Sequence, residues 1–188
     1  CEVSRDWIEA YRRAAATAPG RAVGGRRTNG VPGRLCSVAS HIVLDATHGY
    51  WNRDPASALF FASLNVAFPA LGFHEIGGFD ESFPYAEDRD ICQRWLESGR
   101  RMIYAPDAHI VHHRQLSLPA FWRQHFRYGR GACHLHHALV RRGRSGVQLH
   151  GGLYASMLCL LARERPQYRL IPLAALLVLS QAAYACGM

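Results

Sequence analysis

The stretch from Gly77 to Trp95 reads GGFDESFPYAEDRDICQRW, and it concentrates the acidic residues of the chain. Of the 14 Asp and Glu residues, five lie here: Asp80, Glu81, Glu87, Asp88 and Asp90. Glu87 and Asp88 come one turn before an apolar helical stripe and share its face. An acid at this position has two interpretations. It is either a helix cap, which contributes about 0.5–2 kcal/mol, or a general base in a cleft.

The same stretch resembles the acceptor-site segment of family 2 glycosyltransferases of the GT-A fold. The resemblance rests on Gly-Gly-Phe-Asp-Glu, a short gap, Glu-Asp-x-Asp and a helix ending in Arg-Trp-Leu, and it extends from about Trp7 to the C-terminus. It implies an α/β fold: an incomplete, Rossmann-like GT-A catalytic domain over residues 1–144, followed by a membrane-associated helical hairpin over residues 145–188. It also implies transfer of a sugar, with inversion, from a nucleotide-sugar donor to a hydroxyl acceptor.

The resemblance also assigns roles to individual residues. The second acid of the Glu-Asp pair is the catalytic base in the family, and the matching residue is Asp88. Glu87 and Asp80 belong to the same segment and are candidates for binding the acceptor or sugar. Ser63 and Asn65 lie in FASLNVAF, where small and amide side chains bordered by apolar residues can line a sugar pocket. A turn or edge-strand role for Asn65 is the alternative.

The resemblance further implies a divalent metal, Mg²⁺ or Mn²⁺, held with the sugar nucleotide by an upstream Asp-x-Asp. No such motif precedes Gly77 in this sequence. We therefore interpret the chain as the C-terminal portion of a longer enzyme, inactive alone, whose metal is held mainly by residues absent from it. His112 is a candidate for a place near the metal or diphosphate. A structural histidine is the alternative, and because neighbouring strand residues point to opposite faces, only one of His112 and His113 can enter a given site.

The segment Gln124-His125-Phe126-Arg127-Tyr128 resembles the Q-x-x-R-W element of membrane polysaccharide synthases, with Tyr in place of Trp. Gln124 and Arg127 are i, i+3 neighbours, and an arginine fork suits a diphosphate. We therefore predict that Gln124, Arg127 and Arg130 bind the diphosphate. The alternative is a solvated basic face that contacts anionic lipid headgroups.

The composition adds constraints on partners and location. The net charge is +8, and all 22 basic residues are Arg, which suggests an anionic partner. A membrane-associated, Arg-rich binding module without catalysis is therefore the alternative function. No nucleic-acid-binding fold is recognisable, so nucleic acid is not expected as a partner. The six cysteines form no C-x-x-C pair, which suits reduced thiols in the cytosol.

The C-terminal residues 170–188 carry no charge, which approaches the ~20 apolar residues of a spanning helix. We expect a membrane-embedded or interfacial helix here, with a buried terminal helix as the alternative. The chain is accordingly placed at the cytoplasmic face of a membrane, in polysaccharide or glycolipid biosynthesis, with a lipid-linked or polysaccharide acceptor.

Hydrophobic periodicity and breaker residues predict the secondary structure. Asp90 is expected to face outward or to support Arg89, because it lies about 200° around the helix from Asp88. Extended structure is predicted over residues 21–26, 59–68, 101–105 and 109–113. Helices are predicted over residues 7–18, 34–50, 69–76, 88–98, 117–140, 153–161 and 170–185.

Overall fold

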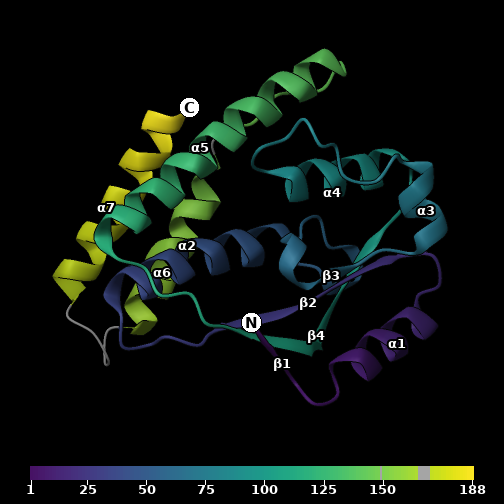
Figure 1. Cartoon of the computed structure of the whole chain (residues 1–188), viewed down its shortest axis with the longest axis horizontal. Coiled ribbons are helices and arrows are strands. Elements are labelled where there is room, and N and C mark those ends of the chain that lie inside the picture. The colour runs from purple at the N-terminus through teal and green to yellow at the C-terminus, as the bar shows by residue number, and fades with distance from the viewer. Residues whose placement is uncertain (149, 165–169) are drawn as a thin grey trace. The chain divides into compact units, whose positions relative to one another are not determined.

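The computed structural model describes residues 1–148, 150–164 and 170–188 (Figure 1). Its strands are β1 (Glu2–Val3), β2 (Ala22–Asn29), β3 (Val66–Ala67) and β4 (Met102–His112). Two 3₁₀ turns cover Pro55–Ser57 and Ser63–Asn65. The helices are α1 (Trp7–Thr17), α2 (Leu35–Trp51), α3 (Ala70–Glu75), α4 (Glu87–Glu97), α5 (Leu118–Arg141), α6 (Gly151–Glu164) and α7 (Leu170–Gly187).

The chain forms two compact units that alternate along the sequence. The first contains Cys1–Gly30, Trp51–Ser82 and Glu87–His113. The second contains Val31–Tyr50, Phe83–Ala86 and Arg114–Met188. The predicted ranges 1–144 and 145–188 stay a prediction. Within the second unit, α2 and α5 pack with the C-terminal helices.

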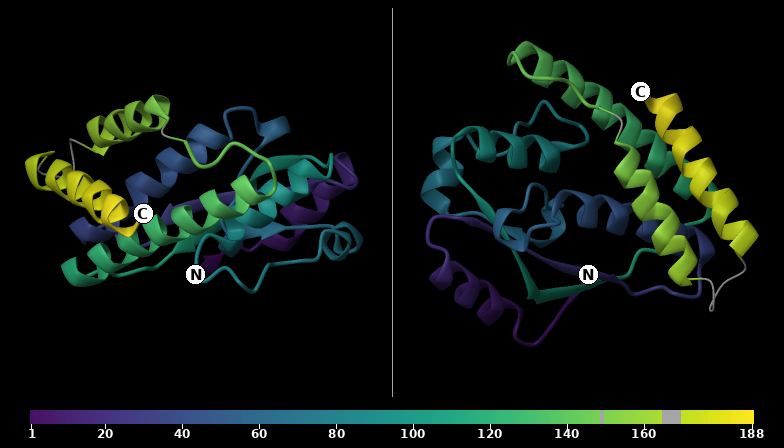
Figure 2. Two further views of the ribbon diagram at one scale, coloured as in Figure 1. Left: turned by 90° about the horizontal axis from the view of Figure 1, so that it is seen from above. Right: turned by 180° about the vertical axis from the view of Figure 1, so that it is seen from behind.

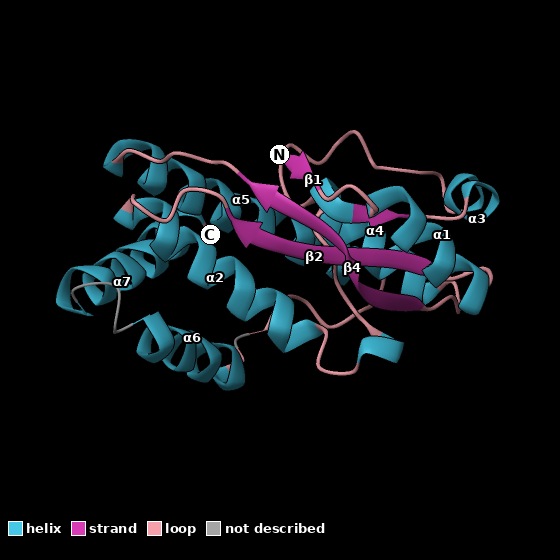
Figure 3. Ribbon diagram, turned by 90° about the horizontal axis from the view of Figure 1, so that it is seen from below, coloured by secondary structure: helices cyan, strands magenta, loops and turns pink. Residues whose placement is uncertain are grey.

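The first unit is built on a mixed sheet with strand order β1-β4-β2-β3 (Figure 3). The central strands β2 and β4 are parallel, whereas β1 and β3 pair antiparallel to them at the two edges. The ladder is irregular between Gly25 and Arg27, whose partners are Ala105 and Ile110. Pro106 falls in this irregularity, so its missing N–H breaks no regular ladder bond.

Alternation along the strands gives the sheet two apolar faces. Ala22 and Met102 pack with Cys92 and Trp95 of α4 on one face. On the other face, the residues Val23, Ala105 and Ala108 pack with Ala10 of α1. The first unit therefore has three layers, with the sheet between α1 and α4 (Figure 1).

The second unit is helical. A shared core joins α2, α5, α6 and α7 through Ile42, Phe121, Leu161 and Leu177. Helices α5 and α7 lie side by side (Figure 2). A Cβ added to Gly129 of α5 would lie 3.0 Å from the Cα of Gly187 in α7, so glycine permits this close approach.

The predicted helices all exist, with ends displaced by a few residues, and the α/β class is confirmed. Two predictions of extended structure differ from the structure. The two strands predicted over residues 101–105 and 109–113 correspond to one strand, β4 (Met102–His112), that passes through Pro106. Residues 59–68 form a 3₁₀ turn and the two-residue strand β3, and not a continuous strand.

Candidate active site

Asp88 is the second residue of α4 and is half-buried in the first unit. Its Oδ1 accepts a hydrogen bond of 2.8 Å from the backbone N–H of Arg89, and a backbone hydrogen bond from Ser63 also reaches the carboxylate. The Ser63 bond places the 3₁₀ turn Ser63–Asn65 against the start of α4. The structure therefore brings together Asp88, Glu87 and Ser63 of the predicted site.

Burial raises the pKa of Asp88 to about 6, and the negative charge of the neighbouring Glu87 contributes to this rise. The charge of Arg89 and the two backbone hydrogen bonds oppose this shift without cancelling it. The capping interpretation alone does not account for this, because a solvated cap carboxylate keeps a low pKa. At neutral pH the carboxylate is ionised and is a stronger base than an ordinary Asp.

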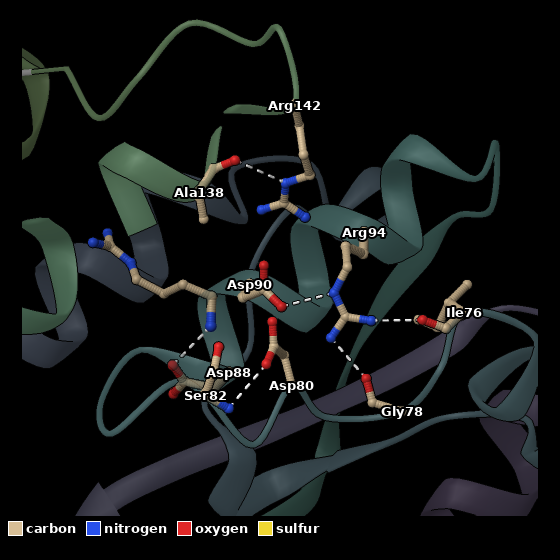
Figure 4. Close-up of polar contacts among 10 residues, drawn as sticks. Ile76, Gly78, Asp80, Ser82, Asp88, Asp90, Arg94, Ala138 and Arg142 are labelled. Atoms are coloured by element: carbon tan, nitrogen blue, oxygen red, sulfur yellow. Dashed lines mark hydrogen bonds and ion pairs between the residues drawn. The ribbon is translucent and has the colours of Figure 1, made fainter. Parts of the chain in front are cut away.

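Asp90 is buried, which corrects the expectation that it faces outward. Its Oδ2 accepts a hydrogen bond of 2.7 Å from Nε of Arg94 (Figure 4). Arg94 donates two more bonds of 2.7 Å, to the carbonyls of Ile76 and Gly78. One guanidinium thus joins α4 to the turn that precedes Asp80. The i, i+4 spacing of Asp90 and Arg94 was the available sequence signal.

Asp80 is exposed, and its Oδ1 accepts a hydrogen bond of 2.9 Å from the backbone N–H of Ser82 (Figure 4). Gly77 and Gly78 both have positive φ, so the turn that carries Asp80 requires glycine at these positions. Arg94 ties this turn to the helix that carries Asp88.

Asn65 does not line a sugar pocket in this structure. Its Oδ1 accepts hydrogen bonds of 2.9 Å from Trp7 Nε1 and from the Tyr11 hydroxyl. Its Nδ2 donates bonds of 2.9 Å to the carbonyls of Arg26 and Ala108. All four bonding positions of the amide are used, and the residue is 5% exposed, so Asn65 joins α1 to the sheet.

His112 ends strand β4, and its Nδ1 lies 3.1 Å from Sγ of Cys1. Within residues 1–148, 150–164 and 170–188, no three His, Cys, Asp or Glu side chains gather as a metal would require. The described part of the chain therefore does not by itself fit the Mg²⁺ or Mn²⁺ that the sequence resemblance implies, and His112 as a metal residue stays a prediction.

The predicted diphosphate residues belong to the second unit. Arg127 and Arg130 are exposed on α5. Gln124 is buried, and its Nε2 donates a hydrogen bond of 2.5 Å to Oγ of Ser40 in α2. Gln124 is therefore not presented to a diphosphate here, because its side chain is buried and its amide bonds to Ser40.

Ala86, directly before α4, has a φ of 67°. Among the described residues it is the one non-glycine residue with positive φ. This conformation costs an alanine about 1–2 kcal/mol. Its neighbour Tyr85 lies under the guanidinium of Arg127, 5.7 Å from the ring centre. Ala86 could not be predicted from the sequence, because alanine carries no signal for a left-handed backbone.

The first unit is thus a mixed α/β unit that carries a partly desolvated carboxylate at the start of a helix. The family model described as "Glycosyl transferase family group 2" matches residues 38–187, and the chain belongs to this family. The recognition made from the sequence is thereby confirmed.

Individual relatives agree with this assignment. The chain is 37% identical over 67 residues to the succinoglycan biosynthesis protein ExoA of Rhizobium meliloti, a match that covers 31% of this chain and 18% of that protein. It is 36% identical over 76 residues to a pre-mycofactocin glycosyltransferase of Mycobacterium tuberculosis, covering 40% of this chain and 16% of that protein. The matched segments thus span less than a fifth of these relatives.

The structural comparison supports the fold. The mannosyltransferase PcManGT from Pyrobaculum calidifontis, solved in complex with GDP-Man and Mn²⁺, superposes with a TM-score of 0.50 and 18% sequence identity. The superposition covers 95% of this chain and 51% of that structure. At this identity the likeness establishes the GT-A fold alone.

Proposed function

We propose that this chain carries the acceptor half of an inverting, nucleotide-sugar-dependent glycosyltransferase, with Asp88 as its general base. The observation that carries the proposal is the Asp88 carboxylate, which is partly desolvated, held by backbone N–H groups and shifted to a pKa of about 6. Its place in the Glu-Asp pair of a family member supports the same role.

The reaction follows from this carboxylate. The acceptor hydroxyl oxygen forms a bond to the anomeric carbon while Asp88 takes the hydroxyl proton. On the opposite face the bond from the anomeric carbon to the diphosphate oxygen breaks, and the electron pair leaves with the nucleoside diphosphate. Arg127 and Arg130 are the residues that we assign to the departing charge, because both are exposed guanidinium groups on α5.

We further propose that the chain works within a longer enzyme. The superposition on the structural neighbour covers 95% of this chain but 51% of that structure, and the matched segments span less than a fifth of the curated relatives. An upstream half would hold the metal and the nucleotide, and the metal would neutralise diphosphate charge there. The full-length enzyme below means this longer chain.

Product stereochemistry tests the proposal. GDP-mannose with Mn²⁺ is the first donor to try, because the structural neighbour was solved with both. Proton NMR of the first product formed by the full-length enzyme should show the anomeric configuration opposite to that of the donor. A product with retained configuration would contradict a single displacement assisted by Asp88.

We also propose that the second unit associates with an anionic membrane surface. Helix α7 is long and apolar enough to cross a membrane, and Ile171 and Val178 are 83% and 70% exposed. Arg123, Arg127 and Arg130 are exposed at i, i+4 and i+7 of α5, so they share one helical face. Such a face attracts anionic lipid by about 1 kcal/mol per Arg, and for Arg127 and Arg130 this lipid contact is the alternative to the diphosphate role.

Vesicle flotation tests this association. The protein should float with vesicles containing phosphatidylglycerol, and replacing Arg123, Arg127 and Arg130 together with Gln should reduce binding by at least about tenfold. The matched control replaces Arg5, Arg12 and Arg13, which are exposed in the first unit, and should leave binding nearly unchanged. Equal loss in both triple variants would show only a general effect of charge.

A further inference from the structure

The segment Phe83–Ala86 lies along one face of α5. The ring of Phe83 is 4.5 Å from that of His134, and Phe83 packs in a core cluster with Leu135, Ala138 and Leu139. The ring of Tyr85 lies under the guanidinium of Arg127. Arg127 precedes Gly131 by four residues on α5. These contacts recur every three or four residues of α5, which is the spacing of one helical face. We call this face and the segment on it the α5 seam.

At Gly131, helix α5 comes close to the backbone of residues 85 and 86. A Cβ added to Gly131 would lie 3.0 Å from the Cβ atoms of both Tyr85 and Ala86, and 3.1 Å from the carbonyl carbon of Tyr85. These separations are shorter than ordinary van der Waals contact. Any other residue at position 131 would therefore push the backbone of residues 85 and 86 away by a few tenths of an ångström.

The displaced backbone is the one that enters α4. Ala86 holds its strained, left-handed conformation one peptide bond before Glu87, and Asp88 follows. Strain of this kind persists only where the surroundings fix it, and it concentrates at functional sites. In this chain the surroundings of Ala86 include Gly131, which belongs to the same compact unit.

We propose that Gly131 and Ala86 are positioning residues that fix the direction in which the chain enters α4, and with it the aim of the Asp88 carboxyl group. The inference rests on the proposed role of Asp88. Neither residue needs to touch the substrate. Arg127 stacks on Tyr85 of the same segment.

The proposal predicts that a substitution at residue 86 partly restores the activity lost by a substitution at residue 131. Gly131→Ala alone should reduce kcat of the full-length enzyme by about tenfold, because displacements well under 1 Å at a reacting group are costly. Ala86→Gly alone should reduce kcat by about threefold, because glycine keeps the positive φ but restrains it less. Ala86→Gly also removes one of the atoms that the methyl group introduced by Gly131→Ala would meet. The double variant should therefore be more active than Gly131→Ala.

The experiment compares these three variants with the wild type and with Gly49→Ala. Gly49 is a matched control because it lies inside helix α2 with nothing within 4 Å of an added Cβ. The KM for donor should be unchanged in all variants. Hydrogen–deuterium exchange of the peptide covering residues 83–91 should be at least about threefold faster in Gly131→Ala and Ala86→Gly than in the wild type or Gly49→Ala.

The outcomes separate the two proposals. Unchanged kcat and exchange in Ala86→Gly, which has no reason to misfold, would overturn the positioning role. A double variant no more active than Gly131→Ala would overturn it as well. If instead the exchange results are as expected while Asp88→Asn keeps normal turnover, the α5 seam stands as a structural restraint and the proposed function fails.

Discussion

Replacing Asn65 with Ala is expected to lower the free energy of unfolding of the first unit by about 3 kcal/mol or more. The change leaves the Trp7 indole N–H, the Tyr11 hydroxyl and the carbonyls of Arg26 and Ala108 without their Asn65 bonds. Each buried group that loses its partner costs about 1–3 kcal/mol. A loss of this size is a large fraction of the total stability of a domain.

Urea unfolding followed by tryptophan fluorescence measures this loss, since Trp7, Trp51 and Trp95 all lie in the first unit. Asn65→Asp should be at least as damaging, because it replaces two donors that face carbonyls with an acceptor. Leu64→Ala is the control, because Leu64 is the neighbouring residue and is 37% exposed. If Asn65→Ala were no more harmful than Leu64→Ala, the amide would not be the link between α1 and the sheet.

Replacing Asp88 with Asn is expected to have the opposite effect on stability. The folded-state pKa of Asp88 is about 6, above the ordinary value of 3.8, so folding keeps a proton that the unfolded chain releases. Below about pH 4 the Asp88 carboxyl group is protonated in both the folded and the unfolded state, so it does not change the free energy of unfolding. As the pH rises from about 4 to about 6 the wild type loses stability, and above that the loss is constant.

The expected size of this loss is roughly 3 kcal/mol, from a shift of about two pKa units at 1.36 kcal/mol each. An asparagine at position 88 cannot ionise, so the Asp88→Asn protein should not lose this free energy of unfolding as the pH rises. It should therefore be more stable than the wild type at pH 7. Measuring the free energy of unfolding of both proteins at pH 4 and pH 7 separates the contribution of Asp88 from that of all other carboxyl groups, which the two proteins share. An equal pH dependence in the two proteins would show that Asp88 is not desolvated.

Much of the fold could be predicted from the sequence, because its signals are local. The apolar periodicity that ends at Gly99 predicted α4, and an amphipathic pattern from residue 117 predicted α5, each within a residue or two of the observed ends. The path of β4 through Pro106 could not be predicted in this way. It depends on the irregular pairing with β2, which no local pattern reveals.

The candidate site was predictable in part for the same reason. Asp88 was found from its motif, and its burial and contact with Ser63 are structural facts that the motif did not contain. Asn65 was assigned to a sugar pocket because an amide among apolar residues can line one, and Gln124 was assigned to the diphosphate through its resemblance to the Q-x-x-R-W element. In the structure their amides bond to buried protein groups, which is the commoner fate of a buried amide.

The turnover of the full-length enzyme with Asp88→Asn tests the central claim most directly. A general base contributes about 10²–10⁴-fold to the rate, so kcat should fall by that factor while the donor KM and the folded structure are kept. An Asp88→Asn enzyme that transfers sugar at the normal rate would contradict the account.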